Sequence, residues 1–438
     1  MTRLSGWGRF PVAACKTRRA RSEADVAAAL DTPLIARGNG RAYGDAALNP
    51  DLTLDMRGTD RMISFDAGTG VLVAEAGVLL ADVIAAFLPR GWFPMVTPGT
   101  KFVTLGGAIA ADVHGKNHHR DGSFRRCLDW IEVMGPEGEV TRTRPGDDLF
   151  DWTCGGMGLT GVILRAQLRL APVATGWIEQ EVRAAPTLDS AMDEMEMTLD
   201  RPYSVAWVDC LASGRDLGRS LIMLGRHADL SDLPAGKRAA PFATPDKTTR
   251  RLPFDLPPAL LNSATLGTLN AAYYARGRRK TGKHLVDWDS YFYPLDTILD
   301  WNRGYGKRGF VQFQCVLPME TARDGMRALL KRISASGQGS FLSVLKRMGP
   351  AEGRFSFPME GYTLALDFPA TDRALALMTR LDEITTEFGG RQYLAKDARM
   401  EKRVLDASDP RAKAFAEMRA QQGLTGQFTS LQSERLGL

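Results

Sequence analysis

The chain has 438 residues, which is too long for one ordinary hydrophobic core and favours two domains. Its hydrophobic fraction of 44% and charged fraction of 24% are typical of a soluble globular protein, and no apolar run reaches the roughly 18 residues that span a bilayer. The net charge of +5 is too small to indicate general nucleic-acid binding, and no zinc-finger or helix-turn-helix pattern is present.

The number and spacing of the cysteines indicate whether the protein works in a reducing or an oxidising compartment. The five cysteines are scattered and lack Cys-x-x-Cys spacing, which favours reduced thiols over a zinc site or a disulfide framework. No long apolar stretch follows Arg18-Arg19, so the sequence predicts neither a secretory nor a twin-arginine signal. We therefore expect a cytoplasmic protein.

The N-terminal region begins with a helix and a strand. Ser22 is a suitable N-cap for a short helix at Arg21–Leu30, and Pro33–Ala36 is expected to form a strand. That strand leads directly into Arg37–Asp45, a loop with Gly-x-Gly-x-x-x-Gly spacing. Because Asn49-Pro50 follows, no helix begins where a Rossmann dinucleotide-binding motif needs one, and the sequence argues against that fold.

Two more glycine clusters, Gly99–Gly107 and Gly155–Gly161, lie among short elements. The expected strands are Leu52–Met56, Met62–Asp66, Val71–Ala76, Leu128–Met134, Val140–Arg144 and Val162–Leu170, and the expected helices are Val78–Leu88 and Asp147–Thr153. Three glycine-rich loops near strand ends indicate a large, extended ligand such as FAD. Alone, the stretch Thr97–Asn117 is equally compatible with a turn followed by a core helix.

After about residue 171 the glycine clusters stop, and strands alternate with helices up to about residue 390. The expected strands are Ser204–Leu211, Ser220–Leu224, Phe310–Leu317, Phe341–Arg347 and Tyr362–Phe368, and the expected helices are Leu188–Leu199, Thr321–Ser334 and Asp372–Phe388. Gln312 and Gln314 share one face of their strand, because successive side chains alternate across a sheet.

Segments along nearly the whole chain resemble flavoproteins of the vanillyl-alcohol oxidase/p-cresol methylhydroxylase superfamily, and within it the decaprenylphosphoryl-β-D-ribose 2-oxidase family. The matching segments are Arg37–Asp45, Pro98–Asn117 with His118-His119, Gly155–Ile163, Trp207, Trp301–Gly306, Gln312–Pro318 and Ala395-Lys396-Asp397. The resemblance implies an α+β, two-domain FAD-binding fold with an inserted substrate domain on a largely antiparallel sheet. It predicts an FAD-binding domain at 1–174, a substrate-binding domain at 175–390 and a return to the FAD-binding domain at 391–438.

The same resemblance implies which residues hold FAD. The loop of Arg37, Gly38, Asn39, Gly40, Arg41, Ala42, Tyr43, Gly44 and Asp45 would surround the pyrophosphate with backbone amides. Gly99, Thr104, Leu105, Gly106 and Gly107 would line the cofactor, with His114, Gly115, Lys116 and Asn117 beside the isoalloxazine, Ile163 near the adenosine half and Tyr393 returning to the flavin. No histidine stands in the first loop, where covalent members of the superfamily attach the flavin, so FAD is expected to be non-covalent.

Lys396 is the first candidate to hold or deprotonate the substrate hydroxyl, because desolvation in an apolar pocket makes a neutral amine accessible. From spacing alone, it could equally be a surface lysine paired with Asp397. His114 is the rival base, or a hydrogen-bonding partner of the flavin. The expected substrate-binding residues are Trp207, Gln312, Gln314, Thr363 and Lys396. His114 and His118 are four residues apart, but no acidic third ligand accompanies them, so no metal site is expected.

The implied reaction is oxidation of the ribose 2-hydroxyl of a polyprenylphosphoryl-β-D-ribose to the 2-keto sugar. A short-chain reductase partner would complete epimerisation to the arabinose donor, and a quinone or another acceptor would reoxidise FAD. The alternatives are an FAD-dependent oxidase of a soluble alditol or aldonolactone, and a flavin-binding scaffold without turnover. Thr363 replaces an asparagine of the family's pocket, and Ala365 replaces a cysteine that mycobacterial members carry, so the identity of the sugar stays open.

Two segments, Leu233–Leu260 and Arg276–Lys283, are proline-rich and basic respectively. They could form mobile loops over the substrate entrance that attract a lipid phosphate or an anionic membrane, or an ordinary solvated surface. The basic residues concerned are Lys237, Arg238, Lys247, Arg250, Arg251, Arg276, Arg278, Arg279 and Lys280. The first alternative would make the protein peripheral to the inner membrane.

Overall fold

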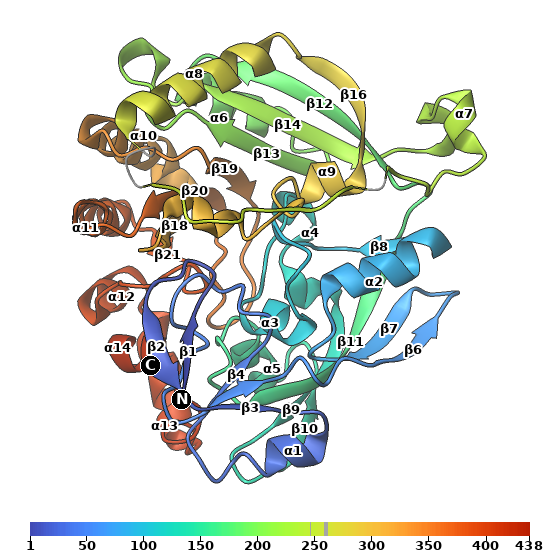
Figure 1. Ribbon diagram of the computed structural model, residues 1–438, viewed down its shortest axis with the longest axis vertical. Coiled ribbons are helices and arrows are strands. Elements are labelled where there is room, and N and C mark those ends of the chain that lie inside the picture. The colour runs from blue at the N-terminus through green and yellow to red at the C-terminus, as the bar shows by residue number, and fades with distance from the viewer. Residues whose placement is uncertain (246, 258–261) are drawn as a thin grey trace.

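The computed structural model describes residues 1–245, 247–257 and 262–438. Figure 1 shows two parts stacked along the long axis of the molecule. One is built mainly from the N-terminal third of the chain and the C-terminal helices, and it contains both termini. The other is built from the middle of the chain. The architecture is α+β, with mostly antiparallel sheets.

The first part contains an antiparallel sheet in the order β10-β9-β11-β7-β6, with β8 also paired to β11. Its strands are β6 (Met62–Asp66), β7 (Val71–Glu75), β8 (Trp92–Pro94), β9 (Leu128–Met134), β10 (Val140–Thr143) and β11 (Val162–Pro172). A small parallel sheet holds β3 (Thr17–Arg19), β5 (Thr53–Asp55) and β4 (Ile35–Arg37), and β1 (Thr2–Ser5) pairs with β2 (Val12–Cys15). The helices are α1 (Glu23–Ala27), α2 (Leu80–Phe87), α3 (Leu105–Ala110), α4 (His118–Asp121) and α5 (Asp148–Thr153).

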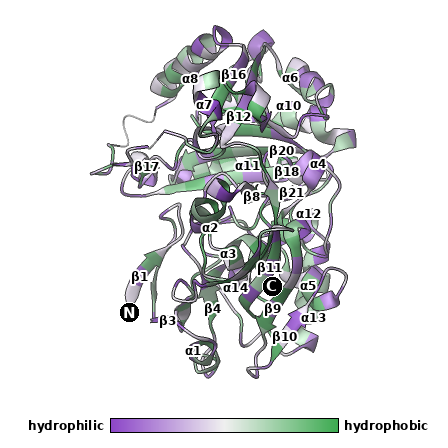
Figure 2. Ribbon diagram, turned by 90° about the vertical axis from the view of Figure 1, so that its right-hand side faces the viewer, coloured by the Kyte–Doolittle hydropathy of each residue, from purple (hydrophilic) through white to green (hydrophobic). Residues whose placement is uncertain are grey.

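The second part is built on an eight-stranded sheet in the order β16-β12-β14-β13-β19-β20-β18-β21, and all neighbouring strands are antiparallel. Its strands are β12 (Trp177–Ala185), β13 (Tyr203–Val208), β14 (Ser220–His227), β16 (Gly282–Asp287), β18 (Phe310–Pro318), β19 (Ser343–Met348), β20 (Gly361–Pro369) and β21 (Arg391–Gln392). Side chains of α6 (Leu188–Glu196), α10 (Met319–Ser336) and α11 (Asp372–Glu387) cover one face and form the largest core with it. In Figure 2 hydrophobic colouring concentrates on the strands between the helical layers.

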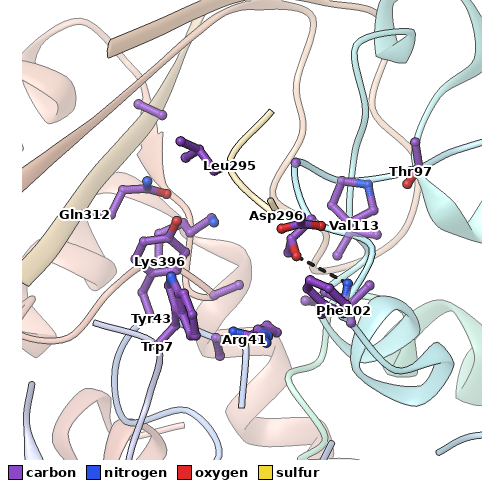
Figure 3. A pocket seen from close by; sticks show the side chains of 18 of the residues that line it. Trp7, Arg41, Tyr43, Thr97, Phe102, Val113, Leu295, Asp296, Gln312 and Lys396 are labelled. Atoms are coloured by element: carbon purple, nitrogen blue, oxygen red, sulfur yellow. Dashed lines mark hydrogen bonds between the residues drawn. The ribbon is translucent and has the colours of Figure 1, made fainter. Parts of the chain in front are cut away.

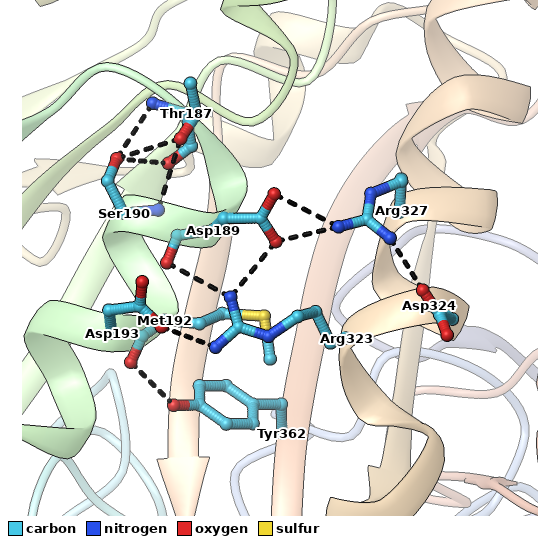
Figure 4. A network of polar contacts seen from close by, with 9 residues as sticks. All are labelled: Thr187, Asp189, Ser190, Met192, Asp193, Arg323, Asp324, Arg327 and Tyr362. Carbon is cyan, nitrogen blue, oxygen red and sulfur yellow. Dashed lines mark hydrogen bonds and ion pairs between the residues drawn. The ribbon is translucent and has the colours of Figure 1, made fainter.

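Helix α6 is joined to α10 by a polar network at the outer surface (Figure 4). Asp189 of α6 pairs with Arg323 at 3.0 Å and with Arg327 at 2.8 Å. Because these side chains are about one third to one half exposed, each pair adds at most ~1 kcal/mol to the free energy of unfolding. The apolar core beneath the helices therefore dominates their attachment to the sheet.

All the predicted strands and helices are confirmed, with ends that agree within three residues. The sequence analysis did not identify β12, β16, the helices α8 (Ser263–Arg278) and α9 (Trp288–Phe292), or the C-terminal helices α12 (Lys402–Ser408), α13 (Arg411–Gln421) and α14 (Leu431–Leu436). The expected loop Leu233–Leu260 contains α7 (Ala235–Arg238) and β15 (Arg250–Arg251), which pairs with β17 (Ile298–Leu299). Its residues 246 and 258–260 lie outside the described residues.

The C-terminal segment returns to the first part of the molecule. The amide of Leu34 donates to the carbonyl of Gln427, and Phe415 shares a core with Ile35. Strand β21, however, pairs with β18 of the eight-stranded sheet, so that sheet continues two residues beyond the expected boundary at residue 390. Among the described residues, no helix combines the length and the apolar character needed to cross a bilayer.

Candidate active site

A cavity of about 1040 Å³ lies between the two parts and is lined by residues of both. Figure 3 shows Arg41 and Tyr43 of the N-terminal glycine loop facing it together with Asp296, Gln312 and Lys396. Pockets for drug-sized ligands measure roughly 300–1,000 Å³. This cavity is therefore large enough for an extended cofactor and part of a substrate.

One wall of the cavity is the sheet face opposite the one that α6, α10 and α11 cover. Trp207 of β13 lies opposite Val344 of β19. Ala365 of β20 lies opposite Val344 on one side and Gln314 of β18 on the other. Because opposite residues in antiparallel strands project from the same face, these four side chains form one row, and all four line the cavity. The indole of Trp207 donates from Nε1 to the Phe341 carbonyl at 3.0 Å.

Glycine loops form the opposite wall. The Thr104 hydroxyl caps α3 by accepting from the Gly107 amide at 3.2 Å, and a Cβ added at Gly38 would overlap that hydroxyl. No atom lies within 4 Å of a Cβ placed at Gly99. Within the described residues, no amide of residues 38–42 donates to another backbone group. Free amides on a close-packed glycine loop are suited to an anionic group such as a pyrophosphate.

Lys396 lies in the turn after β21, and its amide donates to the Tyr393 carbonyl at 2.9 Å. Its Nζ lies 3.8 Å from the ring centroid of Tyr43. Burial lowers the pKa of Lys396, and the Asp367 carboxylate opposes part of that effect. Burial raises the pKa of Asp367, whose Oδ1 accepts from Gln312 while its Oδ2 has no partner among the described residues. The cavity wall thus holds an amine whose pKa is lowered and a carboxyl group whose pKa is raised.

His114 is buried between Gln314 and Lys346. Its Nε2 lies 3.2 Å from Nε2 of Gln314, and its Nδ1 lies 3.3 Å from Nζ of Lys346. Burial holds the pKa of His114 well below its usual value, so the imidazole is neutral at neutral pH. Burial lowers the pKa of Lys346 to about 7, with a smaller effect from Lys396. The sequence analysis did not identify Lys346. Because Lys346 follows Val344 by two positions in the predicted strand Phe341–Arg347, both side chains could have been expected on the same face of the sheet.

Lys116 is a third, partly buried lysine at the cavity. It donates to the Tyr291 carbonyl, and its Nζ lies 4.2 Å from the centroid of the Tyr291 ring. Burial lowers its pKa to about 7, with a smaller effect from Lys346. A cavity with lysines that lose their charge this easily can supply hydrogen-bond donors without a fixed positive charge.

Comparison with known proteins identifies the family. Residues 12–144 match the family model described as an FAD binding domain. The chain is 36% identical over 453 residues to the decaprenylphosphoryl-beta-D-ribose oxidase of Mycolicibacterium smegmatis, and the match covers all of this chain and 97% of that protein. The chain belongs to the decaprenylphosphoryl-β-D-ribose oxidase family. An uncharacterized Streptomyces coelicolor protein is 37% identical over 82% of this chain and 99% of its own length, and rice cytokinin dehydrogenase 7 is 27% identical over 43% of this chain and 37% of its own length.

The chain is therefore an FAD-dependent oxidoreductase of this oxidase family, and the predictions of the cofactor and of the enzyme class are confirmed. The described residues fit FAD. The unpaired amides of residues 38–42 can receive the pyrophosphate, and Gly99 and Gly107 leave the cavity wall without side chains. The FAD-binding domain implies the vanillyl-alcohol oxidase type of fold.

Most of the predicted site residues of this family member line the cavity. These are Gly38, Asn39, Gly40, Arg41, Ala42, Tyr43, Gly99, Thr104, Gly106, Gly107, His114, Gly115, Lys116, Ile163, Trp207, Gln312, Gln314, Tyr393 and Lys396. They come from both parts of the molecule and from its C-terminal segment. Their individual roles toward FAD and substrate stay predictions.

Three predicted residues of the first loop support the cavity from behind instead of lining it. Arg37 donates to the Ser5 carbonyl at 2.7 Å, and Gly44 packs against the backbone at Asp397. Asp45 pairs with Arg435 at 2.8 Å, and Arg435 also pairs with Asp397 at 2.9 Å. The ion pair with Arg435 accounts for Asp397, so the alternative of a surface pair between Asp397 and Lys396 does not hold.

Three further predicted residues are also engaged away from the cavity. Leu105 is buried in the core of the first part. The side-chain amide of Asn117 donates from Nδ2 to the Met95 carbonyl at 2.8 Å. Thr363 lies on the cavity side of β20 but is covered, and its hydroxyl donates to the Cys315 carbonyl at 2.7 Å. Among the described residues, no group of three histidine, cysteine or acidic side chains is arranged to hold a metal ion.

Proposed function

We propose that this chain oxidises the ribose 2-hydroxyl of a polyprenylphosphoryl-β-D-ribose to the 2-keto sugar, with non-covalent FAD as the electron acceptor. Similarity over the full length to an oxidase named for such a ribose supports the substrate class. The observation that carries the proposal is the position of Lys396, a partly buried amine in the same cavity as the glycine loops that fit FAD. A general base must be within reach of the hydroxyl and neutral at the working pH.

The chain's own residues would handle the proton. Bound FAD supplies an acceptor for the hydride of the sugar carbon. The neutral amine of Lys396 accepts the proton of the hydroxyl, and the carboxylate of Asp367 stabilises the ammonium ion that results. The amide of Gln312 holds Asp367 through its hydrogen bond. His114 is not assigned as the base, because both of its ring nitrogens already lie within hydrogen-bond distance of other side chains.

The substrate would enter past α8. Leu269 and Tyr273 of this helix line the cavity although they are 55% and 51% exposed, which provides an apolar path for a prenyl chain. Trp207 forms the cavity wall beside them, with its ring centroid 4.7 Å from that of Tyr273. The exposed Arg278 and Arg279 follow at the end of α8, where they can attract a phosphate or an anionic bilayer.

In this proposal the protein is cytoplasmic and peripheral to the inner membrane. A short-chain reductase would reduce the 2-keto sugar to the arabinose epimer, and a quinone would take the electrons from the reduced cofactor. The substrate domain is the inserted segment 175–390, between an FAD-binding domain at 1–174 and its return at 391–438.

An anaerobic substrate screen tests the reaction. The FAD-loaded protein is mixed with a short-chain polyprenylphosphoryl-β-D-ribose, an alditol or an aldonolactone, and bleaching of the flavin absorbance is followed. We expect the phosphoribose lipid alone to bleach the flavin. Bleaching by the alditol or the lactone instead would favour the soluble-substrate oxidase, and no bleaching by any of them would favour a scaffold; either result rejects the proposal.

A pair of lysine variants tests the assignment of the base. Lys396→Met should slow flavin reduction by ~10²–10⁴-fold, the usual contribution of a general base, while FAD stays bound. The control is Lys402→Met, the same change at an exposed lysine that pairs with Asp406 on α12. An unchanged rate in Lys396→Met would remove Lys396 from the mechanism without affecting the choice of substrate.

Vesicle binding tests the membrane contact. The triple variant Arg278→Gln, Arg279→Gln, Lys280→Gln should bind anionic vesicles more weakly than the wild type, with the difference disappearing at high salt. The control carries the same charge change on the C-terminal helices, at the exposed Lys402, Arg403 and Lys413. Equal binding by the two triple variants would contradict a role for the end of α8.

A further inference from the structure

A continuous series of polar contacts crosses the cavity wall from β18 to β19. The hydroxyl of Thr363 donates to the Cys315 carbonyl at 2.7 Å, and Nε2 of Gln314 donates to that hydroxyl at 3.2 Å. The same Nε2 lies 3.2 Å from Nε2 of His114, and Nδ1 of His114 lies 3.3 Å from Nζ of Lys346. Gln314, Thr363 and His114 are 5%, 1% and 6% exposed, so their partners are other protein groups and not bulk water.

The direction of the first contacts follows from counting hydrogens. A threonine hydroxyl has one hydrogen to donate. Thr363 donates it in a hydrogen bond to the carbonyl oxygen of Cys315, which can only accept. The Thr363 oxygen can then only accept from Gln314. The side-chain amide of Gln314 must therefore turn its NH₂ group, and not its oxygen, toward Thr363, and this group points its second proton at Nε2 of His114.

The direction of these hydrogen bonds also determines which ring nitrogen of His114 carries the proton. A neutral imidazole has one proton, so a ring that accepts at Nε2 carries its proton on Nδ1. The Nδ1–H group of His114 points at Nζ of Lys346, and an ammonium group, which has donors only, cannot accept it. The contact therefore requires the uncharged amine of Lys346, and burial of this lysine, with a smaller effect from Lys396, favours that state.

We propose that the hydroxyl of Thr363 is a positioning group that sets the tautomer of His114 through the amide of Gln314 and so keeps Lys346 as a neutral amine at the cavity. Lys346 and Gln314 line the cavity, whereas Thr363 does not. Lys346 then offers two N–H donors to a ligand without a full positive charge. His114 has no free lone pair for a substrate proton, which leaves that role to Lys396.

The test reads the tautomer directly and needs no substrate. The FAD-loaded, full-length protein is labelled with ¹⁵N-histidine, and long-range ¹H–¹⁵N correlation spectra identify the protonated nitrogen of each ring. The chain has five histidines, and His114→Asn identifies the signals of His114 by their loss. We expect the proton on Nδ1 in the wild type. A wild-type ring protonated on Nε2 would overturn the proposal.

Two substitutions at the same position separate the hydroxyl from the shape of its side chain. Thr363→Ser keeps the hydroxyl and should keep the proton on Nδ1. Thr363→Val keeps the shape but lets the Gln314 amide rotate, so the proton should move to Nε2 and Lys346 should become the donor. The role of Thr363 is refuted by a Thr363→Val spectrum with the wild-type tautomer.

A third variant covers failure of Thr363→Val to fold. Gln314→Glu places an acceptor-only carboxylate beside Nε2 of His114, so this nitrogen should become protonated. A Gln314→Glu spectrum in which Nε2 stays unprotonated would also overturn the proposal. Because every arm measures proton position in the FAD-loaded protein, failure here is distinguishable from failure of the proposed sugar oxidation.

Discussion

The contact between the first glycine loop and the start of α3 gives a sharp stability prediction. Gly38→Ala adds a methyl group that overlaps Oγ1 of Thr104 and comes within 3.1 Å of its Cγ2. The backbone of Gly38 is outside the left-handed region, so alanine is allowed there and only the contact opposes it. Thr104 is 2% exposed and its Oγ1 caps α3, so moving it away gives up the cap.

The cost follows from these two effects. Losing the cap costs about 1 kcal/mol, and one extra methyl in a close-packed site costs about 1–3 kcal/mol. We therefore expect Gly38→Ala to lower the free energy of unfolding by about 2–4 kcal/mol. Unfolding entropy is about 2.1 cal/mol/K per residue, or about 0.9 kcal/mol/K over this chain, so the melting temperature should fall by about 2–4 °C. Thr104→Ala alone should cost only the cap, about 1 kcal/mol.

The double variant tests whether the stability loss of Gly38→Ala comes from its contact with Thr104. Thr104→Ala removes the Oγ1 that the new methyl group overlaps and leaves the Cβ of residue 104 at 3.1 Å, so Gly38→Ala with Thr104→Ala should lose clearly less stability than the sum of the two single losses. Differential scanning calorimetry of the four proteins measures this, and Gly99→Ala, with no atom within 4 Å of its new methyl group, is the control that should melt like the wild type. Additive losses in the double variant would refute the proposed contact.

Three further outcomes can be measured. Flavin reduction should speed up with rising pH as Lys396 loses its proton, and Asp367→Asn should move the midpoint to lower pH because the carboxylate holds the pKa of Lys396 up; an unmoved midpoint contradicts the pairing. Ala365→Cys puts a thiol in a cavity lined by no cysteine among the described residues, so mass spectrometry should find a covalent adduct with an electrophilic nitroaromatic compound that the wild type lacks. Arg435→Met removes the ion-pair partner of the buried Asp397 and of Asp45, and should cost about 3–5 kcal/mol in urea unfolding at neutral pH. Burial raises the pKa of Asp397, but Arg435 and Arg399 hold it below its usual value, so this loss should shrink in acid as the carboxyl becomes protonated.

Local pattern was sufficient for most of the fold. Alternation along Phe310–Leu317 put Gln312 and Gln314 on one face, and the structure has both in the cavity wall. Ser22 caps α1 by accepting from the Asp25 amide, as its position before an acidic first turn predicts. Helix α8 was not predicted from the sequence because its apolar residues do not line up along one face of the helix. Such an apolar face is the pattern by which helices are predicted from sequence periodicity.

The sequence alone was enough to predict the flavoprotein family, through a resemblance carried by segments along nearly the whole chain. It also singled out the three glycine loops by residue type and spacing, and the same resemblance pointed to Lys396. The tertiary structure was needed to place Lys346 in the same cavity as Lys396, to show that Asp45 and Asn117 support the site from outside, and to bring Gln314 within 3.2 Å of Thr363. Strand order and register bring residues such as His114 and Lys346, 232 positions apart, within 3.3 Å. The proton that each buried group carries is set by such neighbours, and no window of sequence contains them.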